Sequence, residues 1–313
     1  MWGQACGRLP PETPPATPTE NEARSDQPRV SPRLVAWATL EVRTAVLRKV
    51  AAKLEASGID CLPVKGILLA RQIYGDPIER PFADVDLLIR PRDFRRAIRV
   101  AKDAGWRLYY DSKILGSVNF IVDGVAFDTV SSIGPPGLCA VGVDEVMRRA
   151  KRGVEPLGFE HLQIERHDHA LLVAIDAFKD KFGVKPQYRE DLIRVVAEGG
   201  FATEQLVDLA TEARLRAMLA IVADWVLEGA ESPAWEDVRK RLATDPLRRG
   251  YMQKFRALMG GPTTGWRGMR LSVLARAASD APARRAMAVA LGAIGTAVFL
   301  VRHRSLTAKG LQD

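Results

Sequence analysis

Apolar residues recur along this chain at two spacings, and these spacings predict which segments are helices and which are strands. Between residues 31 and 57 an apolar residue returns every three or four positions, which is the period of one helix face. Short apolar runs follow, separated by glycine, proline and charged residues, and they predict strands with helices between them. After residue 167 the helical period returns and continues through most of the chain.

The bounds of the elements follow from signals at their ends. Pro91 near a start and Gly105 after an end delimit one amphipathic helix, and Asp123-Gly124 is a strong hairpin signal. We expect a strand, a turn and a helix within 59–74, a loop over 75–83, strands at 84–90, 106–110, 117–123 and 124–130, and helices at 31–57 and 91–104.

These elements indicate an α+β protein of two parts behind a leader. Residues 1–30 hold six prolines and few apolar residues, so we expect a disordered leader without the apolar segment of a secretory signal. We expect a domain of mixed sheet and flanking helices at 31–150, and an all-helical domain at 151–313 that forms the other wall of a cleft. Near the end, the apolar segment 286–301 is shorter than the about 20 residues that a bilayer-spanning helix needs. A buried terminal helix is therefore favoured over a transmembrane span.

The candidate chemistry lies in the stretch 61–91. A strand has a period of two, so Asp84 and Asp86 point to the same side of the strand that they open. Two carboxylates at the start of a buried strand are costly without a cation, and Mg²⁺ prefers such oxygen ligands, completed by substrate phosphates. Upstream, the turn at Lys65-Gly66 opens a helix whose free backbone N–H groups attract an anion. The stretch therefore predicts a site for a metal and a phosphate.

The same stretch carries a family resemblance. The segment VKGILLARQIYGDPIERPFADVDLLI, residues 64–89, resembles the uncharacterised nucleotidyltransferases of bacteria, a family of the DNA polymerase beta-like nucleotidyltransferase superfamily. The matching positions are Lys65, Gly66, Tyr74, Gly75, Asp76, Arg80, Asp84, Asp86, Leu87 and Leu88. Two positions depart from the pattern: Ile67 leaves the turn without the Ser that is usual in the superfamily, and Val130 stands where the family commonly has a His. The resemblance implies the nucleotidyltransferase fold, with a mixed sheet, flanking helices and a helical domain behind it.

The resemblance also implies a catalytic and metal-binding set. Asp84 and Asp86 would bridge two Mg²⁺ ions, and Asp128 on a neighbouring strand would hold the metal that activates the acceptor oxygen. Asp128 would also accept the proton of the acceptor.

The same resemblance implies a set of residues that bind the triphosphate. Gly66, Ile67 and their backbone amides, with Lys65 and Arg80, would hold the triphosphate of an NTP. The alternatives are a solvated Lys65 at the strand end, and an ion pair between Arg80 and an acid of its own loop, Asp76 or Glu79.

The implied activity is the transfer of a nucleoside monophosphate from an NTP to a hydroxyl, with release of pyrophosphate. ATP is the favoured donor, and a protein or a small molecule is the favoured acceptor. A nucleic-acid acceptor is left open, although no RNA-binding module is recognisable. The alternative from another class is a catalytically inactive protein that keeps the fold and binds a nucleotide or a partner.

Composition changes this interpretation little. The formal charge of +8 and the pI near 9.6 suit nucleotides, nucleic acid, acidic proteins or anionic lipid, and do not select among them. Three widely spaced cysteines argue against a zinc site or a disulfide framework, and they fit a reducing cytoplasm.

Five residues in the helical part have two interpretations each. His167 and His169 fit a helix start better than a metal site. Lys179 and Lys181 either line the cleft or lie on the surface, and Asp191 either stabilises the fold or shapes the pocket.

Overall fold

The computed structural model describes residues 30–112, 115–182, 187–242, 246–259 and 265–294. A mixed β-sheet lies between helices from the two halves of the chain. Within these residues the sheet has five strands in the order β1-β2-β5-β4-β3. Its only parallel pair is β2 with β5, and the other neighbours are antiparallel. The strands are β1 (Cys61–Val64), β2 (Asp84–Ile89), β3 (Arg107–Ser112), β4 (Ser117–Val122) and β5 (Val125–Val130).

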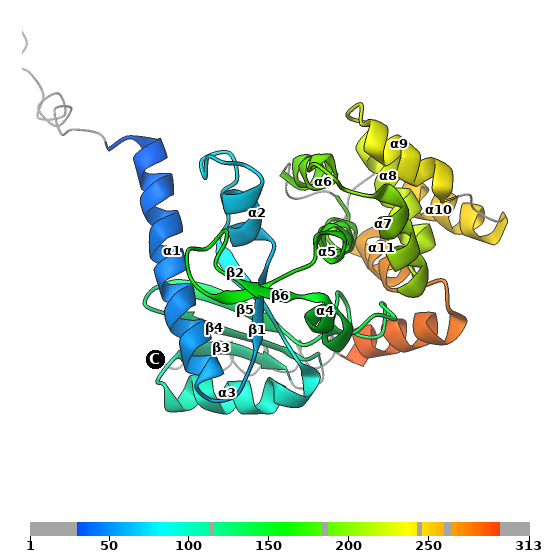
Figure 1. Cartoon of the computed structure of the whole chain (residues 1–313). Coiled ribbons are helices and arrows are strands. Elements are labelled where there is room, and N and C mark those ends of the chain that lie inside the picture. The colour runs from blue at the N-terminus through cyan, green and yellow to red at the C-terminus, as the bar shows by residue number, and fades with distance from the viewer. Residues whose placement is uncertain (1–29, 113–114, 183–186, 243–245, 260–264, 295–313) are drawn as a thin grey trace, which may run out of the picture.

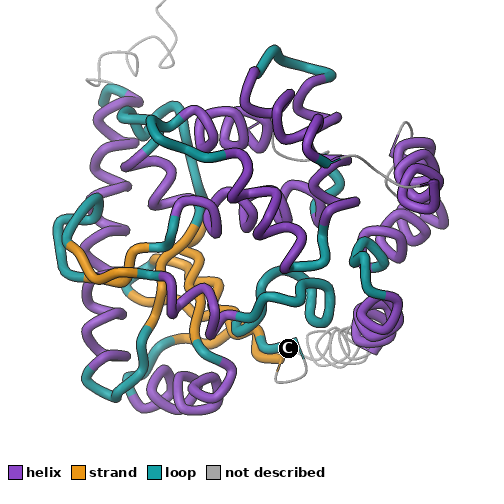
Figure 2. The backbone as a smooth tube through the Cα atoms, turned by 45° about the vertical axis from the view of Figure 1, so that its right-hand side comes forward, coloured by secondary structure: helices purple, strands orange, loops and turns teal. Residues whose placement is uncertain are grey.

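Helices that precede residue 104 cover one face of the sheet and are called the front helices here. Helices that follow residue 165 lie at the other face and are called the rear helices. The front helices are α1 (Pro32–Glu55), α2 (Gly66–Gln72) and α3 (Phe94–Asp103). A hairpin of β6 (Lys151–Gly153) and β7 (His161–Gln163) follows α4 (Val143–Arg149). The rear helices are α5 (Arg166–Lys179), α6 (Gln187–Ala197), α7 (Thr203–Glu212), α8 (Arg216–Leu227), α9 (Pro233–Arg241), α10 (Pro246–Met259) and α11 (Gly265–Arg276), and residues 282–294 are also helical. In Figure 2 the strands gather at one side of the molecule and the rear helices form most of the remainder.

The alternation of side chains along β2 sorts residues between two apolar clusters. Val85 and Leu87 point into a cluster that α1 and α3 complete. Leu88, on the opposite face, belongs to a larger cluster that continues into the rear helices. Since Asp84 and Asp86 share the face of Leu88, both carboxylates point towards α5 rather than α1.

The helix α5 lies between the sheet and the rest of the helical part, as Figure 1 shows. It is buried on nearly every side from His167 to Phe178, which is the pattern of a central helix. The helix α8 is buried in the same way and packs against α5 and α9. The candidate residues on the sheet therefore face a helix whose position is fixed by the core.

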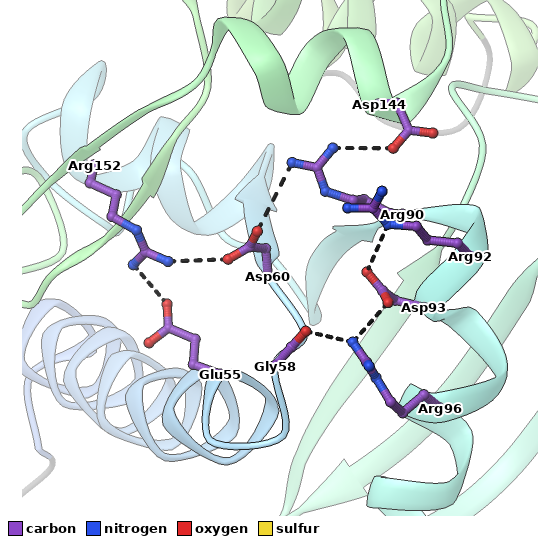
Figure 3. Close-up of polar contacts among 9 residues, drawn as sticks. All are labelled: Glu55, Gly58, Asp60, Arg90, Arg92, Asp93, Arg96, Asp144 and Arg152. Atoms are coloured by element: carbon purple, nitrogen blue, oxygen red, sulfur yellow. Dashed lines mark hydrogen bonds and ion pairs between the residues drawn. The ribbon is translucent and has the colours of Figure 1, made fainter.

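A network of ion pairs stabilises the end of the sheet away from these carboxylates (Figure 3). Arg152 on β6 bridges Glu55, at the end of α1, and Asp60, just before β1. Arg90, directly after β2, donates to Asp144 of α4 at 3.1 Å. Because β1 and β2 are antiparallel, this network and the Asp84 end of β2 lie at opposite ends of the strands.

The strands and helices predicted between residues 31 and 130 agree with the structure, but the part expected to be all-helical from residue 151 begins with the β6–β7 hairpin. Of the leader predicted for 1–30, only Val30 lies among the described residues. The apolar segment 286–301 is helical as far as residue 294, where Ala288 is buried, and its remainder lies outside the described residues. Within the described ranges, every helix is too short or too polar to cross a bilayer. The division into domains at residue 150 stays a prediction.

Candidate active site

Three carboxylates lie on one face of the sheet, where β2 and β5 run side by side. Asp86 is the register partner of Asp128, and Asp84 precedes Asp86 by one full pleat of the strand. Burial raises the pKa of Asp86 to about 6, although the Lys65 ammonium acts in the opposite direction. Burial also raises the pKa of Asp128, and its buried Oδ1 has no hydrogen-bond partner in the described part of the chain. The site therefore holds acidic oxygens whose negative charge is incompletely balanced.

Lys65 occupies the turn between β1 and α2 in a strained backbone conformation. Its φ of 56° and ψ of −123° lie in a region that residues with a side chain rarely adopt. Its backbone N–H donates to His169 Nε2 at 3.1 Å, and its Nζ lies 3.0 Å from Asp86 and 3.1 Å from Asp176. Burial alone would lower the pKa of Lys65, but Asp176 and Asp86 outweigh burial and hold that pKa well above its usual range. The ammonium is thus a fixed cation between the sheet and α5.

The glycine and isoleucine after Lys65 allow close packing at the turn. A Cβ added at Gly66 would lie 2.9 Å from Cβ of Phe82, which is closer than real Cβ atoms approach. Ile67 is fully buried in the cluster below α1. Gly66 therefore lets the start of α2 approach the loop that leads into β2, and the side chain of Ile67 serves the core.

Two groups on α5 complete the charge network around Lys65. Asp176 pairs with Lys65 and also with Lys179, whose Nζ lies 2.8 Å from Asp176 Oδ1. Burial alone would raise the pKa of Asp176, but the two ammonium groups outweigh burial and hold that pKa well below its usual range. Burial lowers the pKa of His169 to about 4, so at neutral pH its ring is uncharged and Nε2 is free to accept the N–H of Lys65.

Arg80 lies in a different interaction from the one that the family resemblance implies. Its Nε donates to Asp191 Oδ1 at 2.7 Å, and its side chain is only 9% exposed. Tyr74 donates its hydroxyl to the same oxygen at 2.7 Å. The ion-pair alternative therefore describes the observed side chain, with Asp191 of α6 as the partner instead of an acid of its own loop. Glu79, one of those acids, pairs with Arg194 at 3.1 Å.

The donors present suit a magnesium ion in their chemistry. Asp84, Asp86 and Asp128 supply only carboxylate oxygens, and one of these is a buried oxygen without a partner. Within the described residues, however, no three acid, His or Cys side chains stand close enough together to enclose an ion. Since the Lys65 ammonium lies against Asp86, a bound ion would share that carboxylate with Lys65.

A cavity of about 420 Å³ lies beside these groups. Asp128, Lys65 and Asp176 line it, whereas Asp84 and Asp86 do not. The loop after β5 forms part of its wall, and Gly134 of this loop lies so close to Ile175 of α5 that an added Cβ would meet Ile175 Cγ2 at 2.5 Å. The cavity thus opens on the Asp128 side of the three carboxylates.

Comparison with known proteins assigns the family. The family model described as "Uncharacterised nucleotidyltransferase" matches residues 38–226, more than half of the chain. The chain belongs to this nucleotidyltransferase family. The match begins in α1, ends in α8 and includes all the carboxylates described above. The chain is accordingly an enzyme of the nucleotidyltransferase type, and the α+β fold expected from the resemblance is confirmed.

Solved structures similar to this nucleotidyltransferase include two of one protein. One is the solution structure of the antibiotic-resistance factor ANT(2'')-Ia, with 12% identity and a TM-score of 0.38 over 54% of this chain and 90% of that chain. The other is the crystal structure of ANT(2'')-Ia in complex with adenylyl-2''-tobramycin, with 14% identity and a TM-score of 0.38 over 54% and 95% of the two chains. The curated proteins gave no match.

Sequence reasoning found the carboxylates on the sheet and missed the contribution of α5. Asp176 is the only charged residue in the apolar run from Ala170 to Phe178, and an isolated acid in such a run is the signal that could have indicated it. The sequence leaves open whether Lys179 lines the cleft or lies on the surface; in the structure it lines the cavity, and its side chain is 42% exposed. His169 does belong to a helix start, as expected, but its contact with Lys65 depends on the fold.

Proposed function

We propose that this nucleotidyltransferase transfers a nucleoside monophosphate from a magnesium-bound NTP, with ATP the favoured donor, to a hydroxyl of a protein or small-molecule acceptor. The observation that carries the proposal is the register of β2 with β5, which brings Asp84, Asp86 and Asp128 to one face of the sheet beside the Lys65 turn. A chain of this family with acids at all three positions has the groups that such chemistry requires.

The proposed role of each carboxylate follows from its position on the sheet. Asp84 and Asp86 would hold two Mg²⁺ ions, and Asp128 would hold the ion nearer the acceptor. When bound, these ions would stabilise negative charge on the attacking and leaving oxygens of an in-line displacement. Asp128 would take the proton of the acceptor hydroxyl as the new bond to the α-phosphorus forms and the bond to the pyrophosphate oxygen breaks. The raised pKa of Asp128 suits it to this role, because a stronger base accepts the proton more readily.

Lys65 and Gly66 would hold the triphosphate. The Lys65 ammonium is already aligned by Asp86 and Asp176, so it would meet phosphate oxygens without a large loss of side-chain freedom. The backbone amides at Gly66 and Ile67 would add hydrogen bonds at the start of α2. Arg80 is not part of this proposal, because Asp191 and the carbonyl of Pro81 accept hydrogen bonds from its guanidinium.

A second candidate function has one observation in its favour. The ion pair of Lys65 with Asp86 at 3.0 Å gives that carboxylate a cation without any metal. A protein that binds a nucleotide or a partner without transferring a nucleotide would keep such a pair. The second candidate therefore predicts nucleotide binding without release of pyrophosphate.

The experiment that separates the two functions follows the fate of the α-phosphate. Purified protein is incubated with each α-labelled NTP and Mg²⁺, alone and with a lysate from its source organism. The proposal predicts that label moves to a protein or small-molecule band, and that Asp84→Asn loses the transfer while retaining the fold. Asp103→Asn, on the exposed face of α3, is the matched control and should transfer like the wild type. NTP binding without movement of label, with and without lysate, would favour the second candidate.

A further inference from the structure

The charges that line the cavity beside Asp128 are unevenly balanced. Lys65 and Lys179 line it, and both are paired with Asp176. Lys181 and Arg276 also line it, and within the described ranges neither side chain forms an ion pair. Both are half-buried, so solvent screens their charges less than those of surface residues. Among the described residues that line the cavity, four cations therefore face two carboxylates, Asp128 and Asp176, so the lining carries an excess of positive charge.

The walls of the same cavity are largely apolar. The α5 side contributes Leu172, Ile175 and Phe178, and the loop after β5 contributes Pro135 and Pro136. A volume of about 420 Å³ falls within the range of about 300–1,000 Å³ that small-molecule pockets occupy. A cavity of this size and lining suits a whole small molecule with an apolar body better than a folded protein surface.

The place of the cavity identifies which substrate it receives. In the proposed reaction Asp128 takes the proton of the acceptor, so the acceptor hydroxyl must reach this carboxylate. Asp128 lines the cavity, whereas Asp84 and Asp86, which would hold the metal of the donor, do not. A molecule in the cavity therefore meets the three carboxylates from the acceptor side.

We propose that this cavity is the acceptor site and that the acceptor is a small molecule with a hydroxyl, an apolar body and an anionic group, which Lys181 and Arg276 bind. The inference rests on the proposed function for the role of Asp128. A cationic acceptor is disfavoured, because it would bring positive charge beside Lys181 and Arg276, which have no acidic partner among the described residues. Phosphate and carboxylate are both suitable as the anionic group, since an arginine pairs with either.

Four probes of similar size test the charge preference. They are 4-hydroxyphenylacetate and 4-hydroxyphenyl phosphate, which are anionic, tyrosol, which is neutral, and tyramine, which is cationic. Binding to the full chain is measured by ligand-observed NMR and by calorimetry. We expect both anions to bind more tightly than tyrosol, and tyramine to bind most weakly. The tighter of the two anions identifies the favoured anionic group.

Variants of the two cations test the location. Lys181→Gln and Arg276→Gln should each weaken binding of the anions by about fivefold or more, because each removes a charge-assisted hydrogen bond. Lys53→Gln and Arg92→Gln are matched controls on exposed surface away from the cavity, and they should bind the probes like the wild type.

Three results would overturn the acceptor assignment. The first is an affinity of tyrosol or tyramine equal to that of the anions, and the second is that none of the four probes binds. The assignment would also fail if Lys181→Gln or Arg276→Gln weakened binding of the Mg²⁺–NTP complex and left the anions unaffected, because the cavity would then belong to the donor. None of these results involves transfer, so the label experiment with Asp84→Asn judges the proposed function separately.

Discussion

The buried pair of Arg80 and Asp191 gives a prediction that the structure makes quantitative. Asp191 is 1% exposed at its side chain, and its Oδ1 accepts hydrogen bonds from Arg80 Nε and the Tyr74 hydroxyl, both at 2.7 Å. Its second oxygen is buried without a hydrogen-bond partner among the described residues. Removing the guanidinium would therefore leave a buried carboxylate with one neutral donor.

Arg80→Met should lower the free energy of unfolding by about 3–5 kcal/mol, the usual cost of removing one member of a buried pair. The double variant Arg80→Met/Asp191→Asn removes the stranded charge as well, and should recover at least about 2 kcal/mol of that loss. The assay is urea unfolding at pH 7, followed by circular dichroism and by tryptophan fluorescence.

An exposed arginine pair supplies the matched control. Arg33 lies 2.9 Å from Asp76, but its side chain is 67% exposed. Arg33→Met should cost less than about 1 kcal/mol, because solvent screens the pair. A loss below about 1 kcal/mol in Arg80→Met, with weaker NTP binding, would refute our reasoning and return Arg80 to the triphosphate site.

Two further predictions concern the groups around Lys65. Asp176→Asn should lower the pKa of Lys65, because Lys65 loses one of its two carboxylate partners. Acetic anhydride at pH 8 should then acetylate Lys65 faster than in the wild type. An unchanged acetylation rate, measured by mass spectrometry, would contradict this. In metal-free protein, the contribution of Asp86 to the free energy of unfolding should fall with rising pH, and that of His169 should rise. With the Asp86 pKa raised to about 6, the native state binds more protons than the unfolded state between about pH 4 and 6, so stability from this group falls with rising pH by about 3 kcal/mol. With the His169 pKa lowered to about 4, the native state binds fewer protons up to about pH 6.5, so stability from this group rises by a similar amount. The difference in stability between Asp86→Asn and wild type should therefore increase as the pH rises through this window, and the difference between His169→Asn and wild type should decrease. If both differences, measured by urea unfolding, change with pH in the same direction, the assignment is wrong.

Local sequence patterns were sufficient to predict most of the part of the site that lies on the sheet. The two-residue period of β2 places Asp84 and Asp86 on one face, and the Asp123-Gly124 turn folds β4 against β5 in register. Both features depend on neighbours within a few residues, which the sequence presents directly. Asp128 needed the family resemblance, because its pairing with Asp86 joins strands that are more than thirty residues apart.

Contacts between distant segments could not be predicted in this way. The sequence near Arg80 offers Asp76 and Glu79 as partners, yet the fold supplies Asp191, which lies 111 residues further along. The hydrogen bond from Lys65 to His169 spans 104 residues. A charged side chain takes the partner that tertiary packing brings to it, and packing of α5 and α6 against the sheet is a property of the whole core.

The most direct test of the central claim measures pyrophosphate release as a function of divalent metal. Wild type, Asp84→Asn, Asp86→Asn and Asp128→Asn are compared with Asp103→Asn, first with Mg²⁺ and then with EDTA, in the presence of the NTP and a fraction that contains the acceptor. Our account predicts release by the wild type and by Asp103→Asn with Mg²⁺, none with EDTA, and a loss of at least about a hundredfold in each of the other variants. Release that persists in EDTA, or in any variant of the three carboxylates at the wild-type rate, would contradict it.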